Sequence, residues 1–350
     1  MPAPSSAATR RIDTASMPSV SATRIATDAS SARPRRGLRA PGSVRRTSTV
    51  DIRRPDGLLG DIVLEGRARD LITRRDGTTE VLGQTRTALR IAMRTRTVES
   101  VESDGDVYGL VQLIGARAGG GFRKSLDDAL PDRRDDGSLL MLLLDETPGT
   151  TLISGSSLAR ALGDHAKKKL DPSAMIDVCA GWEEGGAMAE STRAGEFTYY
   201  GQGPSAPDIR AGDDAIAWHA VDPLDTWDTR RARRIDVTVD DLIRVEGLFR
   251  DSCVIADGTE QVIHEYAVTL EADPDSLVVT HASATPGVLP GPQCPKAADS
   301  AARIVGQPLP QIRRLVRDTF AGPTTCTHLN DELRALGDVH ALVKAARERC

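Results

Sequence analysis

Two cysteines and two histidines near the C-terminal end are the residues best suited to carry chemistry. They are His264, Cys294, Cys326 and His328. Thiolate sulfur and imidazole nitrogen are preferred ligands of Zn²⁺, so the four could form a Cys2His2 metal site. The same residue types also form nucleophile–base pairs, in which a thiolate attacks and a histidine moves the proton. Either chemistry needs these side chains to meet at one point.

The placement of the two cysteines predicts activated thiols. Cys294 precedes Pro295, which begins a predicted helix, and Cys326 follows Thr325, the predicted cap of another helix. Helix N-termini carry partial positive charge, which stabilises a thiolate and lowers its pKa. His328 falls in the first turn of the second helix, within reach of Cys326. The alternative is that each cysteine is a small buried apolar side chain.

The other candidate side chains come from separate parts of the chain. His264 lies on a predicted strand, where it and Glu265 face opposite sides. The four ligands would therefore come from three elements, and their spacing differs from that of a zinc finger. Asp331 and Glu332 follow His328 on its helix and could orient its ring, although acidic residues are also favourable in early helical turns.

The chain contains an internal repeat, which must be recognised before the fold is assigned. Residues 61–91 align with residues 242–272 without a gap. The aligned segments share Glu-Gly, Arg-Asp and Asp-Gly-Thr, at residues 65–66 and 246–247, 69–70 and 250–251, and 76–78 and 257–259. Two more matches follow in the same order, residues 148–151 with 322–325 and 160–163 with 334–337. An ordered series of matches indicates a duplication.

The first copy lacks the candidate residues. The positions of His264, Cys294, Cys326 and His328 align with Gly83, about Phe122, Leu152 and Ser154. This difference is expected if the first copy is structural and the second carries the chemistry. Sequence drift without functional meaning would give the same pattern.

Both copies share one plan of secondary structure. An Asp-Gly pair in each copy predicts a hairpin turn. Further strands are expected at residues 107–113 and 276–280. Helices are expected at residues 295–305, 310–320 and 325–336, from their capping residues and apolar periodicity. Strands followed by helices predict an α+β fold of two pseudo-repeated domains, each an antiparallel sheet followed by helices.

Four segments are expected along the chain. They are a disordered tail at residues 1–44, the degenerate first copy at 45–170, a connector at 171–229 and the second copy at 230–350. The connector is rich in aromatic residues, which are costly to expose to water, so it is predicted to pack on the copies. The alternative is that its aromatic residues line a ligand pocket. Cys179 of the connector could also join the Cys/His site.

Composition argues against membrane and nucleic-acid partners. The net charge is −5, whereas phosphate backbones are bound by clustered positive charge. No apolar run approaches the ~20 residues of a membrane helix. Five widely spaced cysteines do not form a disulfide framework, which favours reduced thiols in the cytoplasm. The arginine pairs at residues 45–46, 230–231 and 233–234 are expected on a solvated face, with phosphate or carboxylate binding as the alternative.

A set of residues in the second copy marks a known family. They are Arg233-Arg-Ile-Asp-Val237, Val245-Glu-Gly247, Asp251, His264, Leu270, Pro292, Cys294, Val305-Gly306 and Cys326-Thr-His-Leu329. With these residues the second copy resembles the bacterial domain-of-unknown-function family 2889, with Thr325 in place of the usual glycine. The resemblance implies a fold unit and candidate site residues but no reaction.

Three functions are compatible with these features. The first is a thiol- or metal-dependent enzyme that acts on a small acyl or aromatic molecule, with Cys326 or Cys294 as the nucleophile and His328 or His264 as the acid–base group. The second is a non-catalytic metal-binding or accessory protein, in which the same residues hold Zn²⁺ or an iron–sulfur species. The third is an interaction protein without a site. Oligomeric state is left open.

Overall fold

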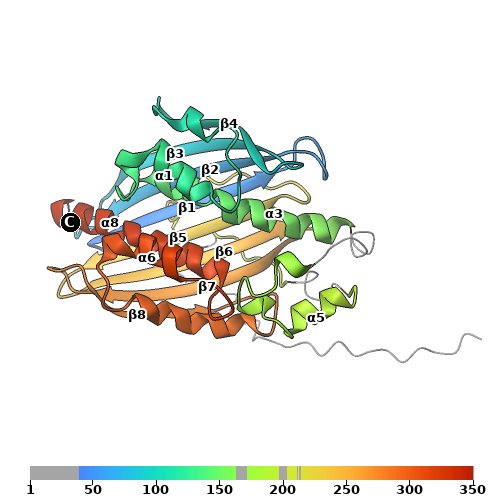
Figure 1. Ribbon diagram of the computed structural model, residues 1–350. Helices are drawn as coiled ribbons and strands as arrows, with labels where there is room; N and C mark the ends of the chain where they lie inside the picture. The colour runs from blue at the N-terminus through green and yellow to red at the C-terminus, as the bar shows by residue number, and fades with distance from the viewer. Residues whose placement is uncertain (1–38, 163–171, 197–202, 211, 213, 350) are drawn as a thin grey trace, which may run out of the picture.

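The protein is built on one eight-stranded antiparallel sheet (Figure 1), in a computed structural model. It describes residues 39–162, 172–196, 203–210, 212 and 214–349. Most of the predicted tail therefore lies outside the described residues, and a strand begins at Ser43, in its last two residues.

The two copies contribute four strands each to this sheet. Their order is β4-β3-β2-β1-β5-β6-β7-β8. The strands are β1 (Ser43–Arg53), β2 (Ile62–Thr73), β3 (Thr79–Ala92), β4 (Thr97–Ser103), β5 (Thr229–Val239), β6 (Ile243–Val254), β7 (Glu260–Ala272) and β8 (Val279–Pro286). The predicted α+β class is confirmed. The expectation of a separate sheet in each copy is wrong, because β1 and β5 pair along almost their whole length. This pairing satisfies two long strand edges that would otherwise be left open.

The two halves are related by a pseudo-two-fold axis through the β1–β5 pair. Arg46 lies opposite Asp70 in the first half, as Arg231 lies opposite Asp251 in the second. By the same offset, Ser48 corresponds to Arg233, and these two residues pair with one another. The axis therefore passes beside Arg233. The repeat seen in the sequence is thus a repeat in space.

Helices cover one face of the sheet (Figure 1). They are α1 (Phe122–Ala129), α2 (Leu139–Asp145), α3 (Thr147–Leu162), α6 (Ile312–Thr319), α7 (Thr327–Ala335) and α8 (Val339–Arg349), with α5 (Ala187–Arg193) in the connector. In the first half α2 packs on β2 and β3, and in the second α7 packs on β6. Both α3 and α8 lie across the central strands β1 and β5. None of the described helices is long and apolar enough to cross a membrane.

Three of the predicted elements differ in the structure. The strand predicted at residues 276–280 begins only at Val279, as β8. The strand predicted at residues 107–113 is wrong: a short 3₁₀ helix, Leu110–Leu113, follows Gly109, whose φ of 102° interrupts an extended chain. The helix predicted at residues 295–305 is the 3₁₀ helix η7 (Cys294–Ile304). Its residues at intervals of three, including Ala297 and Ser300, are buried, as the three-residue turn of a 3₁₀ helix requires.

The connector contacts both halves, partly on the sheet face opposite the helices. Both ring nitrogens of His219 lie 2.9 Å from threonine hydroxyls, those of Thr47 and Thr49 on β1. The carbonyl oxygen of Pro207 accepts a hydrogen bond from Arg250 on β6, 2.7 Å away.

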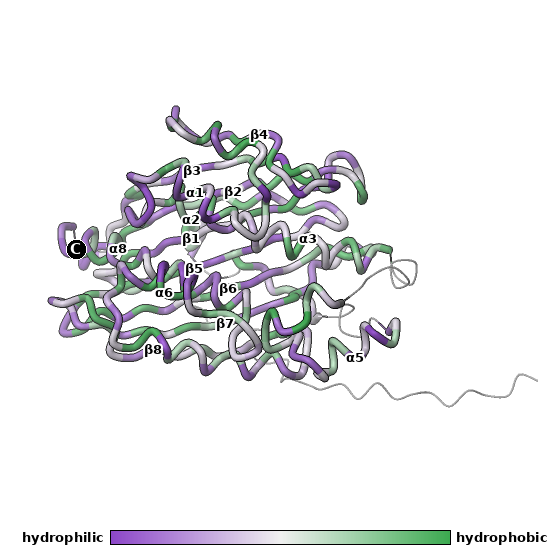
Figure 2. The backbone as a smooth tube through the Cα atoms, viewed as in Figure 1, coloured by the Kyte–Doolittle hydropathy of each residue, from purple (hydrophilic) through white to green (hydrophobic). Residues whose placement is uncertain are grey.

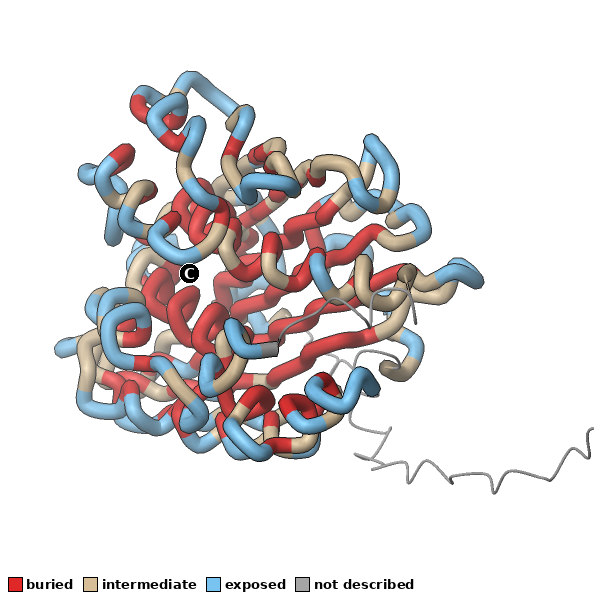
Figure 3. Tube along the Cα trace, turned by 45° about the vertical axis from the view of Figure 1, so that its right-hand side comes forward, coloured by how far each residue is buried: buried red, intermediate tan, exposed pale blue. Residues whose placement is uncertain are grey.

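The centre of the sheet is hydrophilic and yet buried. Figure 2 shows hydrophilic stretches in β1 and β5, and Figure 3 shows the central strands as buried. Arg46, Arg231 and Arg233 are each at most 2% exposed. The expectation that the arginine pairs form a solvated face is therefore wrong. Each guanidinium remains charged inside the protein because carboxylates from the helices and strands surround it.

Arg233 joins the two halves at the pseudo-two-fold axis. Its guanidinium donates to Glu146 at the end of α2 and to Glu332 on α7, 2.6 Å away. One carboxylate thus comes from each half. Burial raises the pKa of Glu332, and the nearby charge of Glu146 raises it further, whereas Arg233 opposes both effects.

Substitution of Arg233 by methionine is predicted to destabilise the whole protein. Arg233→Met removes the cation between two buried carboxylates, and breaking a buried ion pair from one side costs roughly 3–5 kcal/mol. Urea unfolding should show a lower midpoint with an unchanged slope. The matched control is Arg244→Met, which removes an exposed arginine of β6 and should leave the midpoint where it is. A wild-type midpoint for Arg233→Met would contradict the role of this contact.

Candidate metal centre

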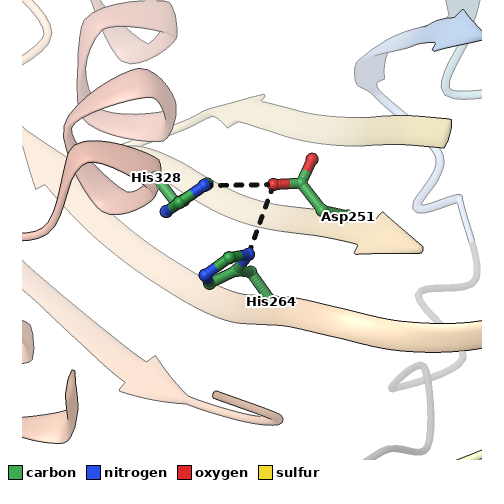
Figure 4. A group of neighbouring side chains, drawn as sticks. All are labelled: Asp251, His264 and His328. Carbon is green, nitrogen blue, oxygen red and sulfur yellow. Dashed lines mark ion pairs between the residues drawn. The ribbon is translucent and has the colours of Figure 1, made fainter. Parts of the chain in front are cut away.

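Asp251, His264 and His328 converge at one buried point, as Figure 4 shows. They come from β6, β7 and α7. Oδ2 of Asp251 lies 3.6 Å from Nδ1 of His264 and 3.7 Å from Nε2 of His328. The two imidazole rings are stacked, with centroids 3.5 Å apart and planes 16° apart. All three side chains are buried.

A β-bulge brings His264 to Asp251. Ser252 pairs with Val262, so a regular ladder would place Ile263 opposite Asp251. The register shift between Asp251 and Ser252 inserts one residue, and His264 takes that position instead. Directly paired residues point to the same face of a sheet, so the bulge turns the imidazole towards the carboxylate.

The two imidazoles are held neutral. Burial and the nearby charge of Arg231 together lower the pKa of His328 to about 3, although the charge of Asp331 opposes them. Burial also places the pKa of His264 well below its usual value. Nδ1 of His264 and Nε2 of His328 are buried and have no hydrogen-bond partner among the described residues. Two uncharged nitrogens therefore face one carboxylate oxygen without a shared hydrogen bond.

Arg231 holds the carboxylate in place. Its Nε lies 2.8 Å from Oδ1 of Asp251, and its Nη2 lies 3.0 Å from Oδ2. This two-point contact fixes the orientation of Asp251. Metal-binding carboxylates are commonly supported by such a second hydrogen-bonding partner.

The donor set fits a transition-metal ion. Distances of 3.6 and 3.7 Å between the donor atoms are too long for hydrogen bonds. They match two bonds of ~2.1 Å to one ion, separated by about 120°. The two rings are stacked in nearly parallel planes, so binding of one ion by both requires the rings to tilt towards it. Unprotonated nitrogen and an ionised carboxylate are the forms that a metal requires.

Asp251 belongs to a larger network of buried charges. Ion pairs connect Asp251 through Arg231 to a network across both halves. It contains the arginines 46, 123, 231, 233, 313 and 334 and the acids Asp70, Asp145, Glu146, Asp251, Asp331, Glu332 and Asp338. Arg231 is therefore the link between Asp251 and the ion pairs that join the two halves.

The two cysteines do not belong to this group. The metal-ligand group found in the described part of the chain holds both predicted histidines but neither cysteine. Cys326 lies 3.8 Å from Nδ1 of His328, the ring nitrogen opposite the one that faces Asp251. Cys294 packs in a buried cluster with Cys179 and Trp182 of the connector. The two histidines therefore belong to the metal-ligand group, Cys294 belongs to the cluster with the connector, and Cys326 lies beside His328 without facing Asp251.

The predicted activation of the thiols is wrong. Cys326 itself, not Thr325, is the N-cap of α7. Backbone N–H groups there lower its pKa, but burial outweighs them and raises the pKa to about 11. Burial likewise raises the pKa of Cys294 to about 12. Both thiols are protonated at neutral pH, because desolvation of a thiolate costs more than the partial charge of a helix terminus returns.

Asp251 and Arg231 are the site residues that sequence reasoning missed. Asp251 was already among the residues that carry the family resemblance, and it aligns with Asp70 in the repeat. Asp251 precedes the Asp257-Gly258 turn and pairs with His264 across that hairpin, so the predicted hairpin could have brought the two residues together. The bulge that decides which face His264 takes has no comparable mark in the sequence.

The first half retains the arginine–aspartate pair but not the two histidines. Arg46 contacts Asp70 at 2.7 and 2.8 Å, as Arg231 contacts Asp251. The position of His264 is occupied by Gly83, as the alignment predicted, and a Cβ there would lie 3.9 Å from Leu139 on α2. The predicted counterpart of His328 is wrong, because Ser154 contacts Arg54 at the far end of β1. The apolar helix α2 packs on β2 and β3, at the place that corresponds to α7 on β6.

Thiol reactivity offers a direct check on the cysteines. With pKa values raised to about 11 and about 12, Cys326 and Cys294 should react with iodoacetamide at pH 7 far more slowly than a free thiol, and at the free-thiol rate only after unfolding. Mass spectrometry of timed digests gives the rate at each site. Rapid labelling of either cysteine in the folded protein would contradict this assignment.

Acid should destabilise the metal-free protein in a window set by its buried histidines. The pKa of His328 is lowered from 6.5 to about 3, so the unfolded chain takes up a proton as the pH falls below about 6.5, while the folded chain does not. Stability is then lost by roughly 1.4 kcal/mol per pH unit for each such histidine. Unfolding of His328→Gln between pH 6.5 and 5 should show a shallower pH dependence than the wild type. Equal slopes would contradict a neutral, buried His328.

Comparison with known proteins places the second half in a described family. Residues 229–342 match the model of a family described as protein of unknown function, DUF2889. The match begins with β5 and ends within α8, so it contains Asp251, His264 and His328. No curated protein and no solved structure matches the chain.

Proposed function

We propose that this protein binds one divalent first-row transition metal ion through Asp251, His264 and His328. The observation that carries the proposal is the convergence of two unpartnered imidazole nitrogens on one carboxylate oxygen in a buried place. Without a cation these buried polar nitrogens have no partner, which is unfavourable in a low-dielectric interior. With a cation, each donor gains a partner.

The donor types narrow the choice of metal. Two imidazoles and one carboxylate suit Zn²⁺ and Fe²⁺, whereas Mg²⁺ and Ca²⁺ prefer sites built from oxygen alone. Because the thiols lie outside the group, a Cys2His2 zinc site and an iron–sulfur species are not supported. We therefore place Zn²⁺ or Fe²⁺ at the site.

Three protein ligands leave at least one coordination position open. Structural zinc sites normally use four protein ligands, whereas sites that do chemistry keep a position for water or substrate. The open position is what favours a metal-dependent activity over a purely structural role. A thiol nucleophile is disfavoured, because Cys326 and Cys294 remain protonated.

Metal titration tests this proposal. Protein stripped with a chelator should take up about one equivalent of Zn²⁺ or Fe²⁺ and unfold at a higher temperature with the ion bound. His264→Gln and His328→Gln keep a polar side chain of similar size and should lose this uptake, and Asp251→Asn should weaken it strongly. X-ray absorption of the loaded protein should show nitrogen and oxygen neighbours and no sulfur.

The controls use residues of the same type outside the group. Cys326→Ser, Cys294→Ser and His219→Gln should keep wild-type metal content, since His219 is a buried histidine on the opposite sheet face. Wild-type stoichiometry in both folded His264→Gln and His328→Gln variants would refute the proposal. So would sulfur in the coordination sphere.

A further inference from the structure

A pocket lies between the two halves, and none of the three metal-ligand residues lines it. It is a pocket of about 200 Å³ between α1 and α2 of the first half and α6 and α7 of the second. Six arginines line it, against four aspartates: Arg123, Arg134, Arg313, Arg314, Arg317 and Arg334. Arginines therefore outnumber aspartates on the pocket wall.

The inner wall holds its arginines in fixed positions. Asp145 binds three of them: Nε of Arg123 at 3.0 Å, Nε of Arg334 at 2.9 Å and Nη1 of Arg313 at 3.4 Å. Asp331 binds Nη2 of both Arg123 and Arg334. The guanidinium groups are therefore arranged before any ligand arrives, which reduces the entropy lost on binding.

Donors remain on these arginines after the internal contacts are made. Within the described residues, Nη1 of Arg123, Nη1 of Arg334 and Nη2 of Arg317 have no hydrogen-bond partner. Arg334 is only 4% exposed, so its remaining surface lies within the pocket that it lines. Burial lowers the pKa of Arg123, and the nearby charge of Arg334 lowers it further. Positive charge is thus crowded at the inner wall.

We propose that this pocket binds a small molecule through an oxyanion, a phosphate or a carboxylate group. The planar guanidinium fork matches both groups with paired, charge-assisted hydrogen bonds. One carboxylate of the protein already binds two of these arginines. Asp127 bridges Arg317 at 2.6 Å and Arg134 at 3.3 Å at the rim of the pocket. The inference does not depend on the metal, since it uses none of the three metal ligands.

The pocket needs both halves of the repeat. Arg123, Asp127 and Asp145 come from the first half, and Arg313, Arg317 and Arg334 from the second. A first copy that lost the imidazoles would still be required to complete this site.

Calorimetric titration at constant ionic strength tests the proposal, with inorganic phosphate and succinate as separate probes. Arg317→Gln should weaken binding about tenfold, because it removes a charge-assisted contact from a partly exposed side chain without disturbing the core. Asp127→Asn should have the opposite effect and tighten binding several-fold, because it releases Arg317 and Arg134 from an internal competitor.

The control variant is Arg244→Gln, an exposed arginine of β6 outside the pocket, which should bind as the wild type does. Binding of phosphate or of succinate alone supports the proposal and identifies the anion. The proposal is overturned if neither probe binds at millimolar concentration. It is equally overturned if Arg317→Gln and Asp127→Asn both bind as the wild type does.

Discussion

Arg231 lies where the sheet, the helices and the two halves of the protein meet. Its guanidinium contacts Asp251 on the neighbouring strand, Asp331 on α7 and Glu146 from the other half. A charge buried at the centre of a sheet is tolerated only when carboxylates surround it, so this one side chain requires all three elements to be in place. The same contact holds Asp251 in the orientation that faces the two imidazoles. The fold and the candidate site therefore depend on one ion-pair network.

That network explains how two similar halves can differ in chemistry. The first half keeps the Arg46–Asp70 pair, but Gly83 takes the place of His264 and the apolar helix α2 packs over the strands there. It still supplies Asp145 and Glu146 to the buried arginines. In physical terms, the first half can lose the metal ligands at little cost to stability, whereas loss of its carboxylates would leave guanidinium groups of the second half unpaired.

Burial determines which chemistry the second half can perform. Desolvation disfavours every charged form, so it keeps the imidazoles neutral and the thiols protonated. Neutral imidazole is a metal ligand, whereas a protonated thiol is a poor nucleophile. The same effect thus favours a metal at His264 and His328 and disfavours nucleophilic attack by Cys326.

Local patterns in the sequence were sufficient for the duplication, the Asp-Gly hairpins, the α+β class and the choice of His264 and His328. These features depend on neighbours in the chain, on turn chemistry and on repeat spacing. The tertiary structure alone decided the rest. A one-residue bulge determined the sheet face on which His264 lies. Pairing of β1 with β5 joined the two expected sheets into one. Helices packed over the sheet buried Arg231. Burial then reversed the expected pKa of Cys326, because desolvation depends on all surrounding atoms and not on the helix terminus alone.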